Sequence, residues 1–147
     1  MLQFGEPIPG ARRRPGAYGI IHDPSRGLAL VTAGGGGLHV PGGGIEAGED
    51  DRDAVVREVA EETGLTVEVI ERIGVVRQAI GHLNKVSHYL WCRVLTEGGP
   101  HEPDHELLWH PWEDAARSLE LGADRWAIAT WAKARGYDAS WRGRPHA

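Results

Sequence analysis

Short apolar runs alternate with turn-forming segments along the chain. In some stretches apolar and polar residues alternate as in a strand, and in others the apolar residues recur with the period of a helix. The predicted strands are 17–22, 28–32, 65–80 (read as one or two strands), 86–95 and 106–110. The predicted helices are one that starts after Asp50 or Asp51 and ends at Gly64, followed by 112–119 and 123–135. This order predicts a mixed β-sheet with helices on both faces.

The longest helical pattern begins after Asp50 or Asp51 as the N-cap and ends at Gly64, which suits a left-handed C-terminal cap. Its valines form one stripe, and its carboxylates occupy the adjoining arc at spacings of three and four: Glu58, Glu61 and Glu62. Three neighbouring carboxylates repel one another unless a cation lies among them, and Mg²⁺ prefers oxygen ligands. A solvated acidic face is the alternative, but such a face more often lies opposite the core.

A glycine-rich segment leads into this helix, with seven glycines among the eleven residues 34–44. Ordering so many glycines costs backbone entropy, which is understandable where a ligand or metal must approach the backbone closely. For residues 34–37, a plain flexible loop explains the composition equally well. For residues 41–44, directly before the acidic helix, we expect a functional role.

No linker or repeat divides the chain, so we expect one domain over residues 1–147. Residues 1–16 contain three prolines and little periodicity, which predicts an irregular arm. The three consecutive arginines at 12–14 are expected to form a solvated cluster, with contact to a phosphate as the alternative. Residues 137–147 are expected to form a loosely docked tail.

Composition narrows the classes of partner. The net charge of −5 argues against a nucleic-acid polymer, because such binding needs a basic surface. The sequence shows no signal-peptide pattern and no apolar run of transmembrane length, so we expect no membrane association and a cytoplasmic location. The single cysteine, Cys92, agrees with a reducing compartment. Oligomeric state stays open, with a homodimer as one alternative.

Residues 43–65 carry a defined motif. Its fixed positions are Gly43, Glu49 after five further residues, and Arg57-Glu58-Val59-Ala60-Glu61-Glu62-Thr63-Gly64-Leu65 after seven more. This resembles the Nudix box, G-x5-E-x7-R-E-U-x-E-E-x-G-U, where U is a bulky aliphatic residue. The paired N-terminal strands and the Pro-Gly-Gly entry also resemble the layout of that family. The resemblance implies an α/β/α sandwich with a central mixed β-sheet and a divalent-metal-dependent pyrophosphohydrolase.

The resemblance also implies roles for single residues. The metal ligands would be the carbonyl of Gly42 and the carboxylates of Glu58, Glu61 and Glu62. Arg57 would orient these carboxylates, while Glu49, Gly43 and Gly64 would support the geometry of the loop and helix. The cofactor would be Mg²⁺, with Mn²⁺ able to substitute. The substrate would be a nucleoside diphosphate linked to a further group, X, which water cleaves to a nucleoside monophosphate and P-X.

Further candidates lie outside the box. In the loop 100–106, Glu106 is the preferred additional ligand or general base, and Glu102 is the second choice. The base itself stays open between a helix glutamate and an acid of this loop. Three more side chains are candidates for contact with a substrate phosphate: His82, Lys85 and His88.

The sequence does not select the substrate. Residues 78–82 lack the proline, tyrosine or SQPWPFP-like markers of several family subgroups, so modified nucleoside triphosphates and broad specificity both stay open. One alternative function is a catalytically silent Nudix-like module that binds or regulates, although such a module has no need of the full glutamate set. Another is an isomerase on the same scaffold, although that branch usually has a degraded box.

Overall fold

The computed structural model describes residues 2–137, so Met1 and all of the predicted tail except Tyr137 lie outside the described part. The strands are β1 (Leu2–Phe4), β2 (Arg12–Asp23), β3 (Gly27–Ala33), β4 (Gly42–Gly44), β5 (Thr66–Ile80), β6 (Leu83–Thr96) and β7 (His105–His110). The helices are α1 (Asp51–Thr63), α2 (Trp112–Ser118) and α3 (Gly122–Ala134).

The strands form one mixed sheet in the order β1-β5-β6-β2-β3-β7, and β4 pairs with β2 beside this path. The longest parallel register joins Arg12–Ile21 of β2 to Leu83–Cys92 of β6. β5 and β6 are antiparallel, as are β3 and β7, whereas β1 runs parallel to β5. The predicted mixed sheet is therefore confirmed.

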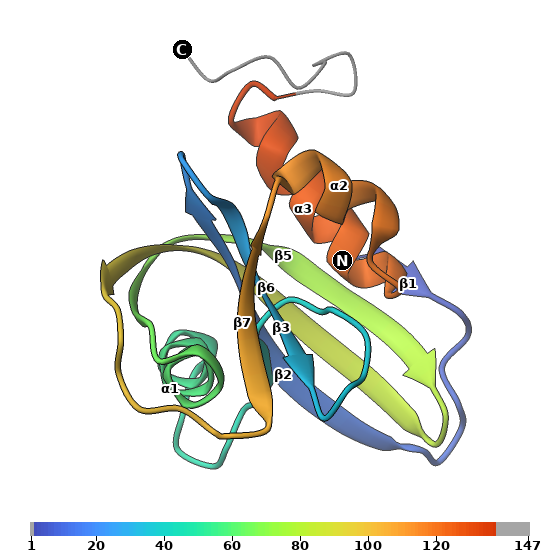
Figure 1. Cartoon of the computed structure of the whole chain (residues 1–147). Helices are drawn as coiled ribbons and strands as arrows, with labels where there is room; N and C mark the ends of the chain where they lie inside the picture. The colour runs from blue at the N-terminus through green and yellow to red at the C-terminus, as the bar shows by residue number, and fades with distance from the viewer. Residues whose placement is uncertain (1, 138–147) are drawn as a thin grey trace.

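Helices cover both faces of the sheet, as Figure 1 shows, with α1 on one side and α2 and α3 on the other. Beneath α1, the buried core includes Val55, Val59 and Leu90. On the other face, α2 and α3 enclose a second core around Tyr89 and Ile128. Burial of these two apolar faces fixes the height of α1 above the sheet and thereby positions its acidic edge.

Both ends of α1 follow the prediction. The Asp50 side chain caps the first turn by accepting from the backbone N–H of Asp53, and the Asp53 side chain accepts from the backbone N–H of Asp50. Gly64 ends the helix with φ of 74°, a left-handed conformation that side chains disfavour. These caps define where the carboxylates on the helix begin and end.

The N-terminal segment differs from the prediction. Residues 1–16, expected to be irregular, contain β1 and the first residues of β2. Pairing with β5 and β6 satisfies the backbone hydrogen bonds of these polar residues, so they form strands without an alternation of apolar and polar side chains. Of the one or two strands predicted for 65–80, the structure has one bulged strand, β5, and β4 is a short strand that its glycines do not predict.

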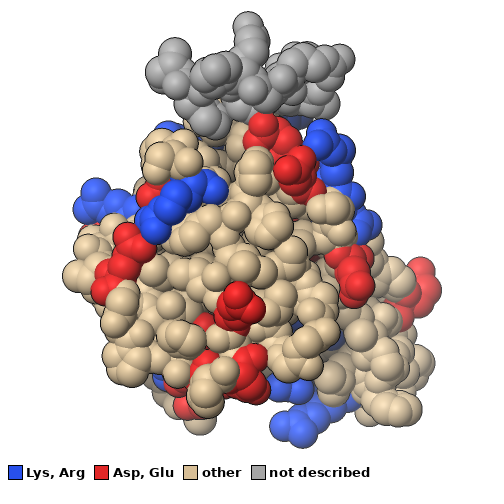
Figure 2. Space-filling model, in the orientation of Figure 1, with Lys and Arg blue, Asp and Glu red and all other residues tan. Residues whose placement is uncertain are grey.

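Charge is distributed unevenly over the surface. Figure 2 shows acidic side chains across the middle of one face, with most Lys and Arg side chains toward its edges. Within residues 2–137, no helix has both the length and the apolar character required to cross a lipid bilayer.

Candidate active site

The edge of α1 that borders the sheet carries the predicted carboxylates. Glu62 lies deepest, with 9% of its side chain exposed, followed by Glu58 at 17% and Glu61 at 43%. The spacing of three and four therefore places them on one face, graded from the protein interior to solvent.

Arg57 joins this edge to the glycine strand. Its Nη1 donates to Glu58 Oε1 at 3.0 Å and to Glu61 Oε1 at 3.2 Å. Its Nη2 donates to the carbonyl of Gly44 at 3.0 Å and to Glu49 Oε1 at 2.8 Å. One guanidinium thus holds two carboxylates of the helix, a third from the loop and the β4 backbone, which a Lys ammonium could not reproduce.

Glu49 lies on the loop before α1, and its side chain links that loop to the helix. It accepts from Arg57 Nε at 2.7 Å and from the backbone N–H of Glu46 at 2.9 Å. Hydrogen bonds from Arg57 lower the pKa of Glu49 to about 2, so it stays ionised. These contacts agree with the supporting role expected of this residue.

Glu62 faces the start of β4. Its Oε1 accepts the backbone N–H of Gly42 at 2.8 Å, and its Oε2 lies 3.4 Å from Nε2 of His105. Burial raises the pKa of Glu62 to about 7, and the charges of Glu58 and Glu102 add to the shift. Burial likewise raises the pKa of Glu58, although Arg57 opposes that change.

The glycines of β4 allow this close approach. A Cβ on Gly43 would lie 2.5 Å from Cδ of Glu58, and a Cβ on Gly42 would collide with the backbone of Ala17. Gly42 also has φ of 151°, which side chains rarely adopt. Contact with Glu58 therefore requires glycine at position 43, and close approach to β2 requires it at position 42.

The loop before β7 brings one acid and one histidine that the sequence did not rank first. The Glu102 N–H donates to the carbonyl of Glu61 at 2.7 Å, and Nδ1 of His105 lies 3.4 Å from Glu102 Oε2 and 3.1 Å from Asp104 Oδ1. Among the described residues, Glu102, Asp104 and His105 also form a group that could hold a metal ion. No helical spacing could indicate His105, because only the register of β7 turns it toward Glu62.

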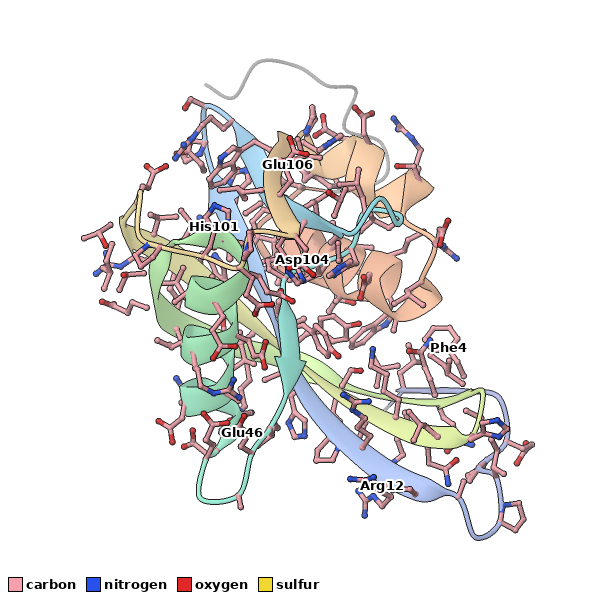
Figure 3. All side chains as sticks on the ribbon, turned by 60° about the horizontal axis from the view of Figure 1, so that its bottom comes forward. Phe4, Arg12, Glu46, His101, Asp104 and Glu106 are labelled. Atoms are coloured by element: carbon pink, nitrogen blue, oxygen red, sulfur yellow. The ribbon has the colours of Figure 1, made fainter. Side chains whose placement is uncertain are left out.

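Glu106 does not join this group. It is exposed and pairs with Thr32 of β3. Neighbouring residues of a strand point to opposite faces, so the orientation of His105 toward Glu62 turns Glu106 away. In Figure 3, Asp104 lies nearer α1 than Glu106 does.

The three candidates for phosphate contact lie apart from one another. His82 is exposed in the turn between β5 and β6. His88 lies 3.4 Å from Asp51, in the first turn of α1 and distant from the carboxylate edge. Lys85 lies over the ring of Tyr18 at 4.6 Å and borders a groove next to Gly43.

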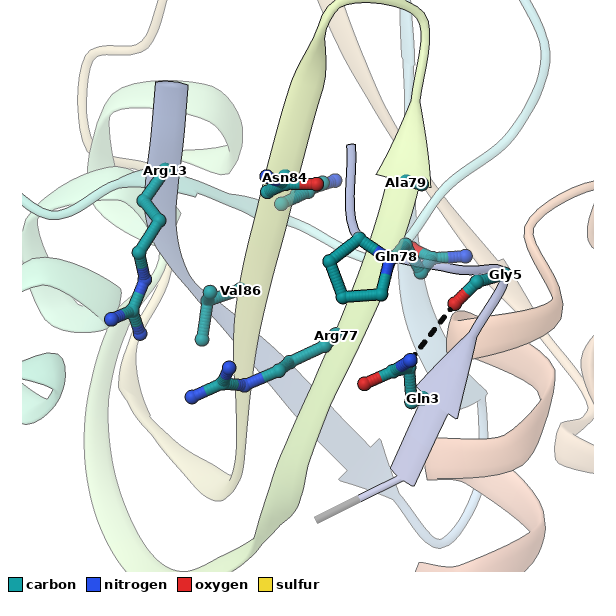
Figure 4. Close-up of a pocket in the computed structure, with 10 residues that line it drawn as sticks. Gln3, Gly5, Arg13, Arg77, Gln78, Ala79, Asn84 and Val86 are labelled. Carbon is teal, nitrogen blue, oxygen red and sulfur yellow. Dashed lines mark hydrogen bonds between the residues drawn. The ribbon is translucent and has the colours of Figure 1, made fainter. Parts of the chain in front are cut away.

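Two adjoining grooves meet at β4. One, of about 470 Å³, runs from Glu58 and Glu46 to the arginines of β2. The other, of about 390 Å³, runs from Gly43 to Tyr18 and Lys85. They share four lining residues: Arg14, Pro15, Gly44 and Leu83. A third pocket, of about 220 Å³, lies beside β1 and is shown in Figure 4.

The donor set at the helix edge fits a hard divalent cation. Glu58, Glu61 and Glu62 offer carboxylate oxygens, which Mg²⁺ and Mn²⁺ prefer. Because desolvation raises the pKa of half-buried Glu58 and of buried Glu62, their ionised forms lack full charge compensation in the cation-free fold. A divalent charge at this edge would supply it.

Comparison with known proteins agrees with this geometry. The sequence profile of the NUDIX domain matches residues 12–132. A Caenorhabditis elegans protein named as a nudix hydrolase is 36% identical over 74 residues, which cover 50% of this chain and 20% of that relative. The chain therefore spans about a fifth of the length of this curated relative.

Solved structures share the fold. A NUDIX hydrolase from Nitrosomonas europaea superposes with a TM-score of 0.75 at 15% identity, covering 92% of this chain and 100% of that one. A MutT NUDIX hydrolase from Burkholderia pseudomallei has a TM-score of 0.67 at 26% identity, covering 80% and 96%. Since the profile covers most of the sequence, and the fold and the glutamate edge agree with it, the chain belongs to the NUDIX domain family.

Proposed function

We propose that this protein is a divalent-cation-dependent pyrophosphohydrolase that cleaves a nucleoside diphosphate linked to X into a nucleoside monophosphate and P-X. The observation that carries the proposal is the carboxylate edge of α1, held by one guanidinium against a glycine strand at the mouth of a groove. Family membership supports the reaction class.

The cation would be held by Glu58, Glu61 and Glu62, with the carbonyl of Gly42 as the further expected ligand. Mg²⁺ is the expected ion and Mn²⁺ a substitute, and either would supply charge neutralisation of the pyrophosphate. Arg57 fixes two of the carboxylates and the β4 backbone, so that the ligands do not reorganise during the reaction.

In the reaction, the oxygen of water forms a bond to one phosphorus of the pyrophosphate, and the bond from that phosphorus to the bridging oxygen breaks. A carboxylate accepts the proton of the water, and the bridging oxygen leaves with the other product. Glu102 is favoured over Glu106 for this role, because its backbone is bonded to Glu61 and its side chain adjoins His105. Glu102→Gln should therefore lower kcat about 100-fold, and Glu106→Gln should change it little.

The function is tested with a panel of nucleoside diphosphate derivatives, with and without Mg²⁺. We expect release of nucleoside monophosphate only with the cation, and a fall of about 1,000-fold in kcat in Glu61→Gln, as removal of preorganised charge stabilisation commonly causes. Thermal unfolding of the variant serves as the folding control. Turnover no greater in the wild type than in Glu61→Gln would support the silent-module alternative instead.

A further inference from the structure

The proposed chemistry leaves the arginines of β2 without a role. Arg12, Arg13 and Arg14 line the same groove as Glu58, yet within residues 2–137 their side chains form no hydrogen bond or ion pair. The two acids of that groove are instead directed to Arg57, with Glu58 at 3.0 Å and Glu46 at 3.8 Å. The basic end of the groove is therefore left uncompensated.

The strand register makes this arrangement costly. Arg14 of β2 lies directly opposite Lys85 of β6, and like charges at opposed positions destabilise a sheet. Alternation along β2 places Arg12 on the same face as Arg14. Three cations thus gather on one face of a chain whose net charge is −5, an arrangement that an anionic ligand would stabilise.

The position of these cations relates them to the reaction centre. Arg14 and Gly44 belong to both grooves, which end at Glu58 on one side and at Lys85 and Tyr18 on the other. A ligand whose pyrophosphate lies at Glu58 would therefore extend past Gly44 toward Arg14. In Figure 3, Arg12 lies on the part of β2 that projects beyond the helices, across from Glu46.

Arg13 belongs to a different surface. It also lines the small pocket beside β1, where Figure 4 shows it extending to the same side of the sheet as Arg77, over Val86. Lys85 borders that pocket too, but alternation along β2 turns Arg13 to the face opposite Arg14, so Arg13 is left out of the cluster.

We propose that Arg14 and Lys85, with Arg12 beside them, bind a phosphate group that the substrate carries in addition to its scissile pyrophosphate. This inference rests on the proposed function. Guanidinium forks bind phosphate oxygens in pairs, and three cations match a dianionic phosphate better than a carboxylate of single charge. The extra phosphate belongs either to X, as in a nucleoside triphosphate, or to the ribose of the nucleoside.

The test uses three matched substrates built on the nucleoside that the wild type cleaves best. They are the nucleoside diphosphate sugar, the nucleoside triphosphate, and the same diphosphate sugar with a 2′-phosphate on the nucleoside. We expect Arg14→Gln and Lys85→Gln each to lower kcat/KM about tenfold or more for one phosphorylated substrate, mainly through KM. With the unphosphorylated diphosphate sugar, both variants should stay within about twofold of the wild type, which also shows that they fold.

Arg117→Gln is the matched control, because it removes an exposed arginine of α2 that lines neither groove. The phosphorylated substrate that responds identifies the source of the phosphate. A loss equal for all three substrates, or no greater than in the control, would overturn the inference and leave the hydrolase standing. Absence of turnover with every substrate would instead remove the proposed function. Calorimetry with inorganic triphosphate would then decide the inference, since unchanged affinity in Arg14→Gln would contradict it.

Discussion

Arg57 is the single residue on which the geometry of the carboxylate edge most depends. It contacts Glu49, Glu58, Glu61 and the carbonyl of Gly44 at 2.7 to 3.2 Å. Hydrogen bonds with these acids, first of all Glu49, raise its pKa further above its already high value. The cluster is therefore held by one planar cation rather than by separate contacts.

Arg57→Lys should therefore lower kcat at least tenfold while retaining most of the fold, because an ammonium cannot bridge Glu49, Glu58 and Gly44 together. Binding of Mn²⁺, measured by electron paramagnetic resonance, should weaken in parallel. Full activity in the lysine variant would show that only the charge matters.

Glu62 gives the metal-free protein a defined pH dependence. Its pKa is raised from 4.5 to about 7, mainly by burial, so the folded state binds a proton more tightly than the unfolded chain does. The stability from this group is full below about pH 4.5 and is lost as the pH rises through about 7. With cations chelated, Tm should fall over this window, and it should fall less in Glu62→Gln, which can still accept from Gly42. Parallel curves for the two proteins would contradict the expectation.

Single residues also show how far the sequence could predict the site. The box glutamates and Arg57 come together because helix geometry converts their spacing into one face. His105 and Glu102 approach Glu62 only through the path of the loop and the register of β7, which no local pattern encodes. For the same reason the sequence favoured Glu106, which the strand turns away from Glu62.

At the level of elements, α1 was predictable because its caps, valine stripe and length agree with one another. The extension of β2 to Arg12 was not, because RRRPG gains its strand conformation from pairing with β6 rather than from its own propensity. The same holds for β4, whose three glycines pair with β2 beside the carboxylates. These two unpredicted segments line the grooves that meet at β4.

Gly64, the C-terminal cap of α1, is the position where the structure predicts the effect of a substitution on helix stability most clearly. Its φ of 74° and the close approach of the Gly99 carbonyl leave no room for a side chain. Gly64→Ala should lower the free energy of unfolding by more than about 1 kcal/mol, as measured by urea denaturation. Gly48→Ala is the comparison, because Gly48 also has positive φ but no atom within 4 Å of its Cβ position. Equal losses would assign the whole effect to backbone strain.

At the scale of the whole molecule, the fold separates stability from chemistry. One buried core on each face of the sheet stabilises the fold, and the charged edge of α1 borders a groove outside these cores. A cation that binds the folded state alone should stabilise it by mass action. At one hundred times its Kd, Mg²⁺ should raise Tm by about 5–10 °C, and Glu58→Gln should abolish most of this rise. An equal rise in the variant would place the ion elsewhere.

The identity of the products that form with Mg²⁺ decides whether this protein hydrolyses a pyrophosphate bond as proposed. The wild type and Glu61→Gln would be incubated with the best nucleoside diphosphate derivative of the panel and followed by phosphorus NMR. We expect equal amounts of nucleoside monophosphate and P-X in the wild type alone, and none when the cation is chelated. Equal turnover in both proteins, or release of intact nucleoside diphosphate and free X, would contradict it.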